Sequence, residues 1–117
     1  MLDHVGLRTA QLHPMVSFYQ AALAPLGYKI MMQFEGNAGL GRDTPDLWIS
    51  ETETDVSHLH LAFTTDDRSV VDAFHVAAIA NGGTDNGAPG KRDYTPTYYA
   101  AFVLDPDGNN IEVVCHL

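Results

Sequence analysis

The sequence of 117 residues is short of basic side chains and of cysteine. Six Lys and Arg stand against fifteen Asp and Glu, which gives a formal net charge of -9. A surface for nucleic acid or for an anionic membrane needs clustered Lys and Arg, so this composition argues against both kinds of partner. Because Cys115 is the only cysteine, no internal disulfide can form, and we expect a reducing compartment.

Long apolar runs and flexible linkers are also missing. No stretch is apolar for long enough to span a membrane, and Asp3 comes too early for the apolar part of a signal peptide. We therefore predict a cytoplasmic protein whose partners are small molecules or proteins. No linker rich in Ser, Gly or Pro divides the chain, and 117 residues with 45% hydrophobic content suffice for one core. The sequence predicts a single domain over residues 1–117.

What is present is a succession of strands and helices that occurs twice. Residues 2–7 alternate between apolar and polar, as in a strand, and residues 9–27 have helical spacing; three short extended segments follow at 28–34, 38–41 and 46–51. The second half repeats this order with a strand at 58–63, a helix at 68–83, a weak strand near 84–88 and strong strands at 98–104 and 109–115. The pattern predicts an α+β fold of two β-α-β-β-β modules, about 1–54 and 55–117, related by a pseudo-twofold axis and forming a curved mixed sheet.

Glu112 is an unexpected charge in an otherwise apolar strand, DPDGNNIEVV. Alternate side chains of a strand project to opposite faces, so Glu112 points away from the face that Ile111 and Val113 pack. By the same alternation, His4 and His60 are predicted to point away from the packed faces of their own strands. A strand histidine is commonly a plain surface residue, but an unpaired inward carboxylate costs on the order of several kcal/mol. If the three faces line one trough, two His and one Glu suffice to hold a divalent metal ion and leave positions open.

In LDHVGLRT, HLHLAF and DPDGNNIEVV, and in its doubled plan, the chain resembles the vicinal oxygen chelate superfamily, which includes glyoxalase I, extradiol dioxygenases and bleomycin-resistance proteins. The resemblance covers essentially the whole chain. It implies that the metal ligands are His4, His60 and Glu112, that the ion is Fe, Mn, Ni or Zn, and that a small molecule with vicinal oxygens is the substrate. It also implies a homodimer, because family members pair chains to cover exposed edges and the trough. The metal site can be completed within one chain or across two.

One departure from the family pattern bears on the reaction. Glyoxalase I has a fourth ligand, which also moves a proton, at the counterpart of Glu112 in the first module. That position falls in DLWISE, where Trp48 or Ser50 faces the trough. The remaining His-His-Glu set is similar to that of the iron-dependent extradiol dioxygenases, which are longer chains. The alternative is a metal-free protein of the bleomycin-resistance type that binds a small molecule.

Five further residues are candidates for the site. His58, on the same face as His60, can act as an acid or base, and Tyr98 can orient a substrate oxygen; a solvent-facing position and core packing are the competing roles. Trp48, Tyr94 and Arg92 are candidates for the substrate pocket. Trp48 can equally fill the trough, and the basic pair of Lys91 and Arg92 can equally be a solvated loop.

Overall fold

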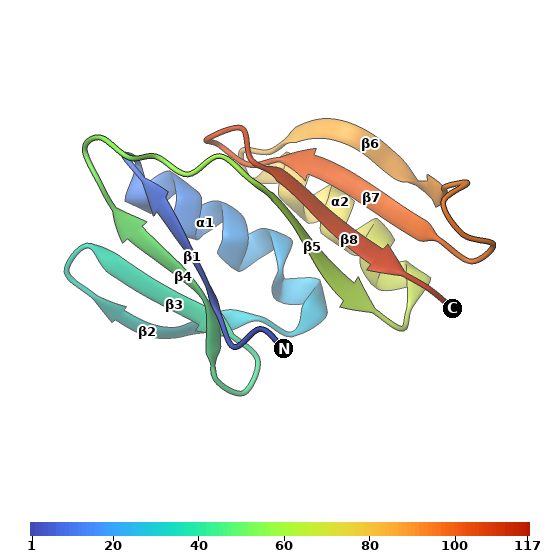
Figure 1. Ribbon diagram of the computed structural model, residues 1–117, viewed down its shortest axis with the longest axis horizontal. Helices are drawn as coiled ribbons and strands as arrows, with labels where there is room; N and C mark the ends of the chain where they lie inside the picture. The colour runs from blue at the N-terminus through green and yellow to red at the C-terminus, as the bar shows by residue number, and fades with distance from the viewer.

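A computed structural model describes all residues from 1 to 117 and shows two modules with the same order of elements (Figure 1). The first module consists of β1 (Val5–Thr9), α1 (Leu12–Ala22), the short 3₁₀ helix η1 (Ala24–Leu26), β2 (Lys29–Phe34), β3 (Asn37–Gly41) and β4 (Pro45–Glu51). The second consists of β5 (His60–Thr65), α2 (Arg68–Ala80), β6 (Thr84–Lys91), β7 (Tyr99–Leu104) and β8 (Asn110–Cys115). Neither helix has the length and apolar character needed to cross a membrane.

Each module forms its own four-stranded mixed sheet. The strand orders are β1-β4-β3-β2 and β5-β8-β7-β6, and in each sheet the first and last strands of the module pair in parallel while the other pairs are antiparallel. Both helices lie on the same side of the two sheets, which leaves the opposite faces open (Figure 1). The predicted α+β fold of two β-α-β-β-β modules is confirmed, with one sheet per module.

Several element boundaries differ from the predicted ones for local reasons. Thr9 belongs to β1 rather than to the helix, and its Oγ1 accepts a hydrogen bond of 3.0 Å from the backbone N–H of Gln11, just before α1 begins. The chain leaves α1 through a 3₁₀ turn that contains Pro25 and closes on Gly27, whose φ of 87° favours glycine. Strand β6 continues to Lys91, beyond the predicted end, because Lys91 pairs with Tyr99 across the hairpin.

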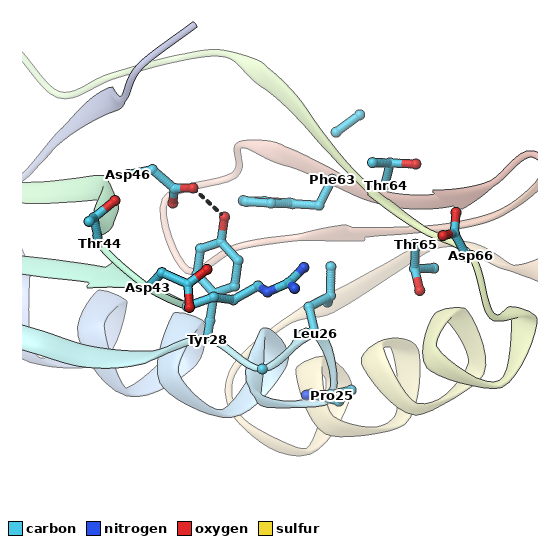
Figure 2. A pocket seen from close by; sticks show the side chains of 13 residues that line it. Pro25, Leu26, Tyr28, Asp43, Thr44, Asp46, Phe63, Thr64, Thr65 and Asp66 are labelled. Atoms are coloured by element: carbon cyan, nitrogen blue, oxygen red, sulfur yellow. Dashed lines mark hydrogen bonds between the residues drawn. The ribbon is translucent and has the colours of Figure 1, made fainter.

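The two modules are joined at one end of their common boundary and separated at the other. At the joined end, the Tyr19 hydroxyl of α1 donates to Asp105 Oδ2 over 2.5 Å, and Gln11 Nε2 donates to Asp107 Oδ1 over 2.6 Å. Both acceptors lie in the turn that precedes β8. At the other end, the turn between β3 and β4 faces the C-terminal half of β5 across a cleft of ≈ 990 Å³ (Figure 2).

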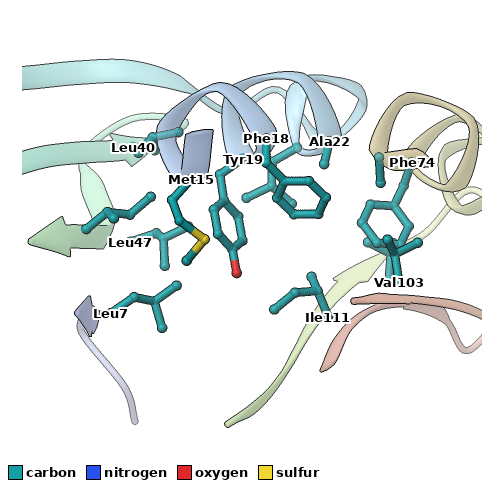
Figure 3. Packing of buried hydrophobic residues seen from close by; sticks show 14 of the residues in the cluster. Leu7, Met15, Phe18, Tyr19, Ala22, Leu40, Leu47, Phe74, Val103 and Ile111 are labelled. Carbon is teal, nitrogen blue, oxygen red and sulfur yellow. The ribbon is translucent and has the colours of Figure 1, made fainter. Parts of the chain in front are cut away.

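A single cluster of 19 buried residues draws on both modules. Phe18 and Tyr19 of α1 lie between Leu7 and Leu47 of the first module and Ile111 of the second (Figure 3). Each large apolar side chain buried in this way contributes roughly 1.5–3 kcal/mol by leaving water. The predicted packed faces are confirmed: Leu7 in β1, and Ile111, Val113 and Cys115 in β8, all belong to this core.

Candidate metal centre

Glu112 is buried although it faces away from the helices. It lies in β8 between Ala62 of β5 and Phe102 of β7, and it is 2% exposed. The segment from 92 to 98 connects β6 to β7, and the backbone N–H of Arg92 donates to the Tyr98 carbonyl over 2.8 Å at its base. Tyr98 is thus held immediately before β7, next to the strand of Glu112, and its hydroxyl contacts the carboxylate.

Both oxygens of Glu112 have a partner. Oε1 lies 3.1 Å from Nε2 of His60, and Oε2 accepts a hydrogen bond from the Tyr98 hydroxyl. Burial, followed by the hydrogen bond to Glu112, raises the pKa of Tyr98 to about 12. Tyr98 is therefore a hydrogen-bond donor near neutral pH, and it leaves Oε1 directed toward His60.

The orientation of the His60 ring is set by its second nitrogen. Nδ1 lies 2.9 Å from the carbonyl oxygen of Asn110, and because a carbonyl can only accept, Nδ1 carries the hydrogen. In neutral His60 the lone pair of Nε2 is then directed at Glu112 Oε1, which is also an acceptor. Two acceptors 3.1 Å apart need a positive charge between them, either a proton on Nε2 or a metal ion. The imidazole is further held by stacking on Phe102, with ring centroids 6.3 Å apart.

The pair fits the donor set of a divalent ion. Neighbouring ligands with bonds of about 2.1 Å at right angles stand about 3.0 Å apart, close to the observed separation of Nε2 and Oε1. A ligating histidine usually donates its other ring N–H to a carbonyl or carboxylate, as His60 does to Asn110. Two of the three predicted ligands therefore lie together with the geometry of adjacent metal ligands.

The third predicted ligand lies apart from this pair. His4 precedes β1 on the other sheet, its side chain is 57% exposed, and no group of three His, Cys, Asp or Glu side chains within the chain is placed to hold a metal ion. Its Nδ1 lies 2.7 Å from Asp3 Oδ1, so its Nε2, like that of His60, is the nitrogen left for another partner. One chain alone does not complete the predicted set of ligands.

Comparisons with known proteins now bear on this arrangement. The model of the Glyoxalase/Bleomycin resistance protein/Dioxygenase superfamily matches residues 1–113. The chain belongs to this superfamily. A crystal structure of a glyoxalase/bleomycin resistance protein from Albidiferax ferrireducens T118 is similar, with 30% identity, a TM-score of 0.87, and 100% of this chain and 99% of that chain covered.

Two further solved structures share the superfamily fold. A glyoxalase/bleomycin resistance protein/dioxygenase family enzyme from Burkholderia phytofirmans PsJN has 24% identity and a TM-score of 0.77, with 98% of each chain covered. A glyoxalase I mutant from Zea mays has 24% identity and a TM-score of 0.73, and the match covers 97% of this chain but 45% of that one. No match was found among curated proteins.

Strand register identifies the counterpart of Glu112 in the first module of this superfamily member. Trp48 pairs with Gly6, two residues after His4, and Glu112 pairs with Ala62, two residues after His60. Trp48, rather than Ser50, therefore occupies the position where a fourth ligand was sought. An indole has only an N–H donor and cannot ligate a metal through a lone pair.

The other predicted pocket residues divide between the two sheets. Trp48 lies on the first sheet, with its ring 6.0 Å from that of Phe34, so within one chain it is not part of the Glu112 site. Tyr94 is 69% exposed and makes an edge contact with the Tyr98 ring at 5.0 Å. Arg92 stands over Phe102, but its guanidinium already donates to the carbonyls of the hairpin at residues 88 and 90.

Two further histidines lie outside the Glu112 site. His58 is exposed ahead of β5 and forms no side-chain hydrogen bond, so the structure brings it into no contact with Glu112. His75 of α2 is half-buried and lies 2.9 Å from Asp85. Phe102 is the site residue that sequence reasoning missed, because its place beside His60 depends on the register between β7 and β8.

Proposed function

We propose that this protein is a metal-dependent enzyme of the glyoxalase/dioxygenase type that acts on a small molecule with two adjacent oxygen atoms. The observation that carries the proposal is the pair formed by Nε2 of half-exposed His60 and Oε1 of buried Glu112, two acceptors 3.1 Å apart. A carboxylate buried on an open sheet face is costly unless it is paired, and a divalent ion would satisfy both atoms at once.

Each residue of the site has a distinct task in this proposal. His60 and Glu112 hold the ion, and the Asn110 carbonyl keeps the His60 ring in the ligating orientation. Tyr98 occupies Oε2 of Glu112, so that Oε1 alone is offered. When bound, the ion supplies Lewis-acid polarisation of substrate oxygens. Of the two candidates for a catalytic role, His58 and Tyr98, Tyr98 is the one that contacts Glu112, and its raised pKa gives it the part of a hydrogen-bond donor.

The third ligand would come from a second copy of the chain in a homodimer. His4 is exposed, and its Nε2 forms no hydrogen bond. The open faces of both sheets are available for pairing. His60 and Glu112 do not line any of the four surface hollows of the chain, so a single chain leaves this site without enclosing walls. A second copy that brings His4 over the pair would supply both a ligand and a wall.

Metal analysis of protein purified without chelators tests the proposal. We expect about one divalent ion per chain, and its loss in His60→Ala and in Glu112→Gln, because each removes a ligand. Glu53→Gln, at an exposed carboxylate away from the site, is the control and should retain the ion. Failure of the wild-type protein to bind Fe, Mn, Ni or Zn, even when each is added in excess, would refute the metal site. Two activity assays then separate the reaction types: oxygen uptake in the presence of catechols would indicate dioxygenase chemistry, and isomerisation of thiol adducts would indicate glyoxalase chemistry.

The metal-free alternative is favoured by one observation, the presence of Trp48 where a second carboxylate would complete the pseudosymmetry. Trp48 and Phe34 offer an aromatic surface on which a planar ligand can stack. In this alternative, a proton on His60 satisfies Glu112, and the protein binds its ligand without turnover. Trp48→Ala would then weaken ligand binding, whereas Glu112→Gln would leave it unchanged.

A further inference from the structure

The open end of the boundary between the modules is a cleft that neither His60 nor Glu112 lines. It measures ≈ 990 Å³, and its walls are Tyr28 with the turn at 42–46 on one side and residues 62–66 on the other, with η1 as the floor (Figure 2). Small-molecule sites occur preferentially between packed units and usually measure roughly 300–1,000 Å³. The size and place of this cleft therefore suit a small ligand.

One wall of the cleft holds a carboxylate oxygen without a partner. The Tyr28 hydroxyl donates to Asp46 Oδ2 over 2.9 Å, as the dashed line in Figure 2 shows, but Oδ1 of Asp46 is buried and forms no hydrogen bond. Burial and the bond to Asp46 raise the pKa of Tyr28, so this hydroxyl remains a donor and stays on Oδ2. A buried carboxylate oxygen is best satisfied by a charged N–H donor.

The same cleft contains a guanidinium group without a partner. Arg42 lines the cleft and forms neither a salt bridge nor a side-chain hydrogen bond within the chain. A guanidinium binds a carboxylate or a phosphate through two parallel hydrogen bonds. Asp43, Asp46 and Asp66 line the same cleft, so the four charged groups sum to −2 and oppose a doubly charged phosphate. A singly charged carboxylate that brings its own positive charge meets less repulsion.

We propose that this cleft binds a small zwitterion of the amino-carboxylate class, a free amino acid or a short peptide, with its ammonium beside the Asp43 and Asp46 carboxylates and its carboxylate on Arg42. The apolar part of the ligand would lie against Tyr28 and Phe63, whose rings meet edge to face at 5.6 Å. None of the proposed metal ligands lines this cleft, so the binding is a second function; His4 lines an adjoining hollow together with Tyr28 and Asp46.

Titration of the isotope-labelled full chain, followed by NMR, tests the proposal. The probes are L-leucine and leucyl-leucine, which separate a free amino acid from a peptide. N-acetyl-leucine lacks the ammonium, and leucine methyl ester lacks the carboxylate. We expect amide shifts at Gly27, Thr44 and Thr65, which line the cleft, with none at Ile111. We expect both blocked derivatives to bind at least about tenfold more weakly, since each loses one charged contact.

Variants of the two charged groups provide the decisive comparison. Arg42→Gln and Asp46→Asn should each weaken binding about tenfold or more, while Arg8→Gln, at an arginine paired with Asp55 outside the cleft, should not. No shift at about 10 mM of either zwitterion, or unchanged affinity in Arg42→Gln, overturns the proposal. Glu112→Gln separates the two proposals: it removes the metal site and should leave these shifts in place, and their loss would assign the ligand to the metal centre instead.

Discussion

A few polar side chains hold the two modules together, and they come from the motif that also carries the candidate ligand. Asp105 is 4% exposed and accepts hydrogen bonds from Tyr19, from the backbone N–H groups of Asp107 and Asn109, and from the Asn109 amide. The side-chain oxygen Oδ1 of Asn109 in turn accepts a hydrogen bond from the backbone N–H of Leu59. Within DPDGNNIE, the residues before the strand therefore serve the structure, and Glu112 is left for chemistry.

Tyr19→Phe tests this joint. The change removes a buried donor to Asp105 Oδ2 while keeping the ring in the core, so we expect the free energy of unfolding to fall by about 1–3 kcal/mol. Urea denaturation followed by circular dichroism measures it. Tyr99→Phe is the matched control, because that hydroxyl bonds to exposed Asp72 and its loss should cost about 0.5 kcal/mol or less. Equal losses in the two variants would show that burial of the joint adds nothing.

Stability should also depend on alkaline pH through Tyr19. Burial, and then the nearby charge of Asp105, raise the pKa of Tyr19 well above its ordinary value of 10.0. Since the unfolded chain ionises first, the stabilisation is complete below about pH 10 and declines as the pH rises toward the folded pKa, by about 1.4 kcal/mol per pH unit for one proton. Free energies of unfolding measured between pH 8 and pH 11 check this decline. In Tyr19→Phe the decline should be shallower.

Within the first sheet, glycine in β3 makes room for the aromatic ring of β4. A Cβ atom added at Gly39 would lie 2.8 Å from Cη2 of Trp48, closer than such atoms approach in folded proteins. Gly6 borders Trp48 from the other side, in β1, and a Cβ there would meet nothing within 4 Å. The indole is therefore seated over β3, and Gly39 determines its position on the open face.

Gly39→Ala should displace the indole, whereas Gly6→Ala should not. We expect a shift in tryptophan fluorescence, which reports only Trp48, together with destabilisation of about 1–3 kcal/mol from overpacking. Gly6→Ala tests the same exchange on a neighbouring strand without the clash. An unchanged emission spectrum in Gly39→Ala would mean that the ring is not held over β3.

At the scale of the whole molecule, the proposed dimer has two identical sites, each built from both chains. Mixing His4→Ala protein with Glu112→Gln protein should then restore metal binding that neither variant has alone. In a mixed dimer one site keeps all three ligands and the other has lost both kinds, so random exchange leaves about one site in four intact. Metal content and catalytic activity measure the recovery.

Chain exchange must be demonstrated in this experiment, for which differently tagged copies and co-purification suffice. No recovery in a population shown to contain mixed dimers would exclude a site shared between chains. If each chain instead completes its own site, no recovery is expected, because every chain in the mixture lacks one ligand. The two arrangements left open by the sequence are thus distinguished by a single mixture.

Much of the fold could be predicted because it depends on local pattern. Alternation in β8 placed Ile111 and Val113 in the core and Glu112 on the opposite face, as observed. The predicted start of β5, at residue 58, was two residues too early. Residues 58–59 continue the apolar–polar alternation, but the backbone N–H of Leu59 donates to the Asn109 side chain rather than to a neighbouring strand. Contacts across strands, such as Phe102 beside His60, depend on register and have no signature in one segment.

The sequence by itself determined which side chains face away from the helices, because the two-residue period of a strand fixes faces without knowledge of the neighbours. It also determined the doubled order of elements. Only the tertiary structure decided which of those side chains meet. His60 and Glu112 come together because β5 and β8 are neighbours in one sheet, and His4 stays apart because its strand belongs to the other. The distance between two side chains depends on how sheets are placed in space, and no periodicity along the chain encodes that placement.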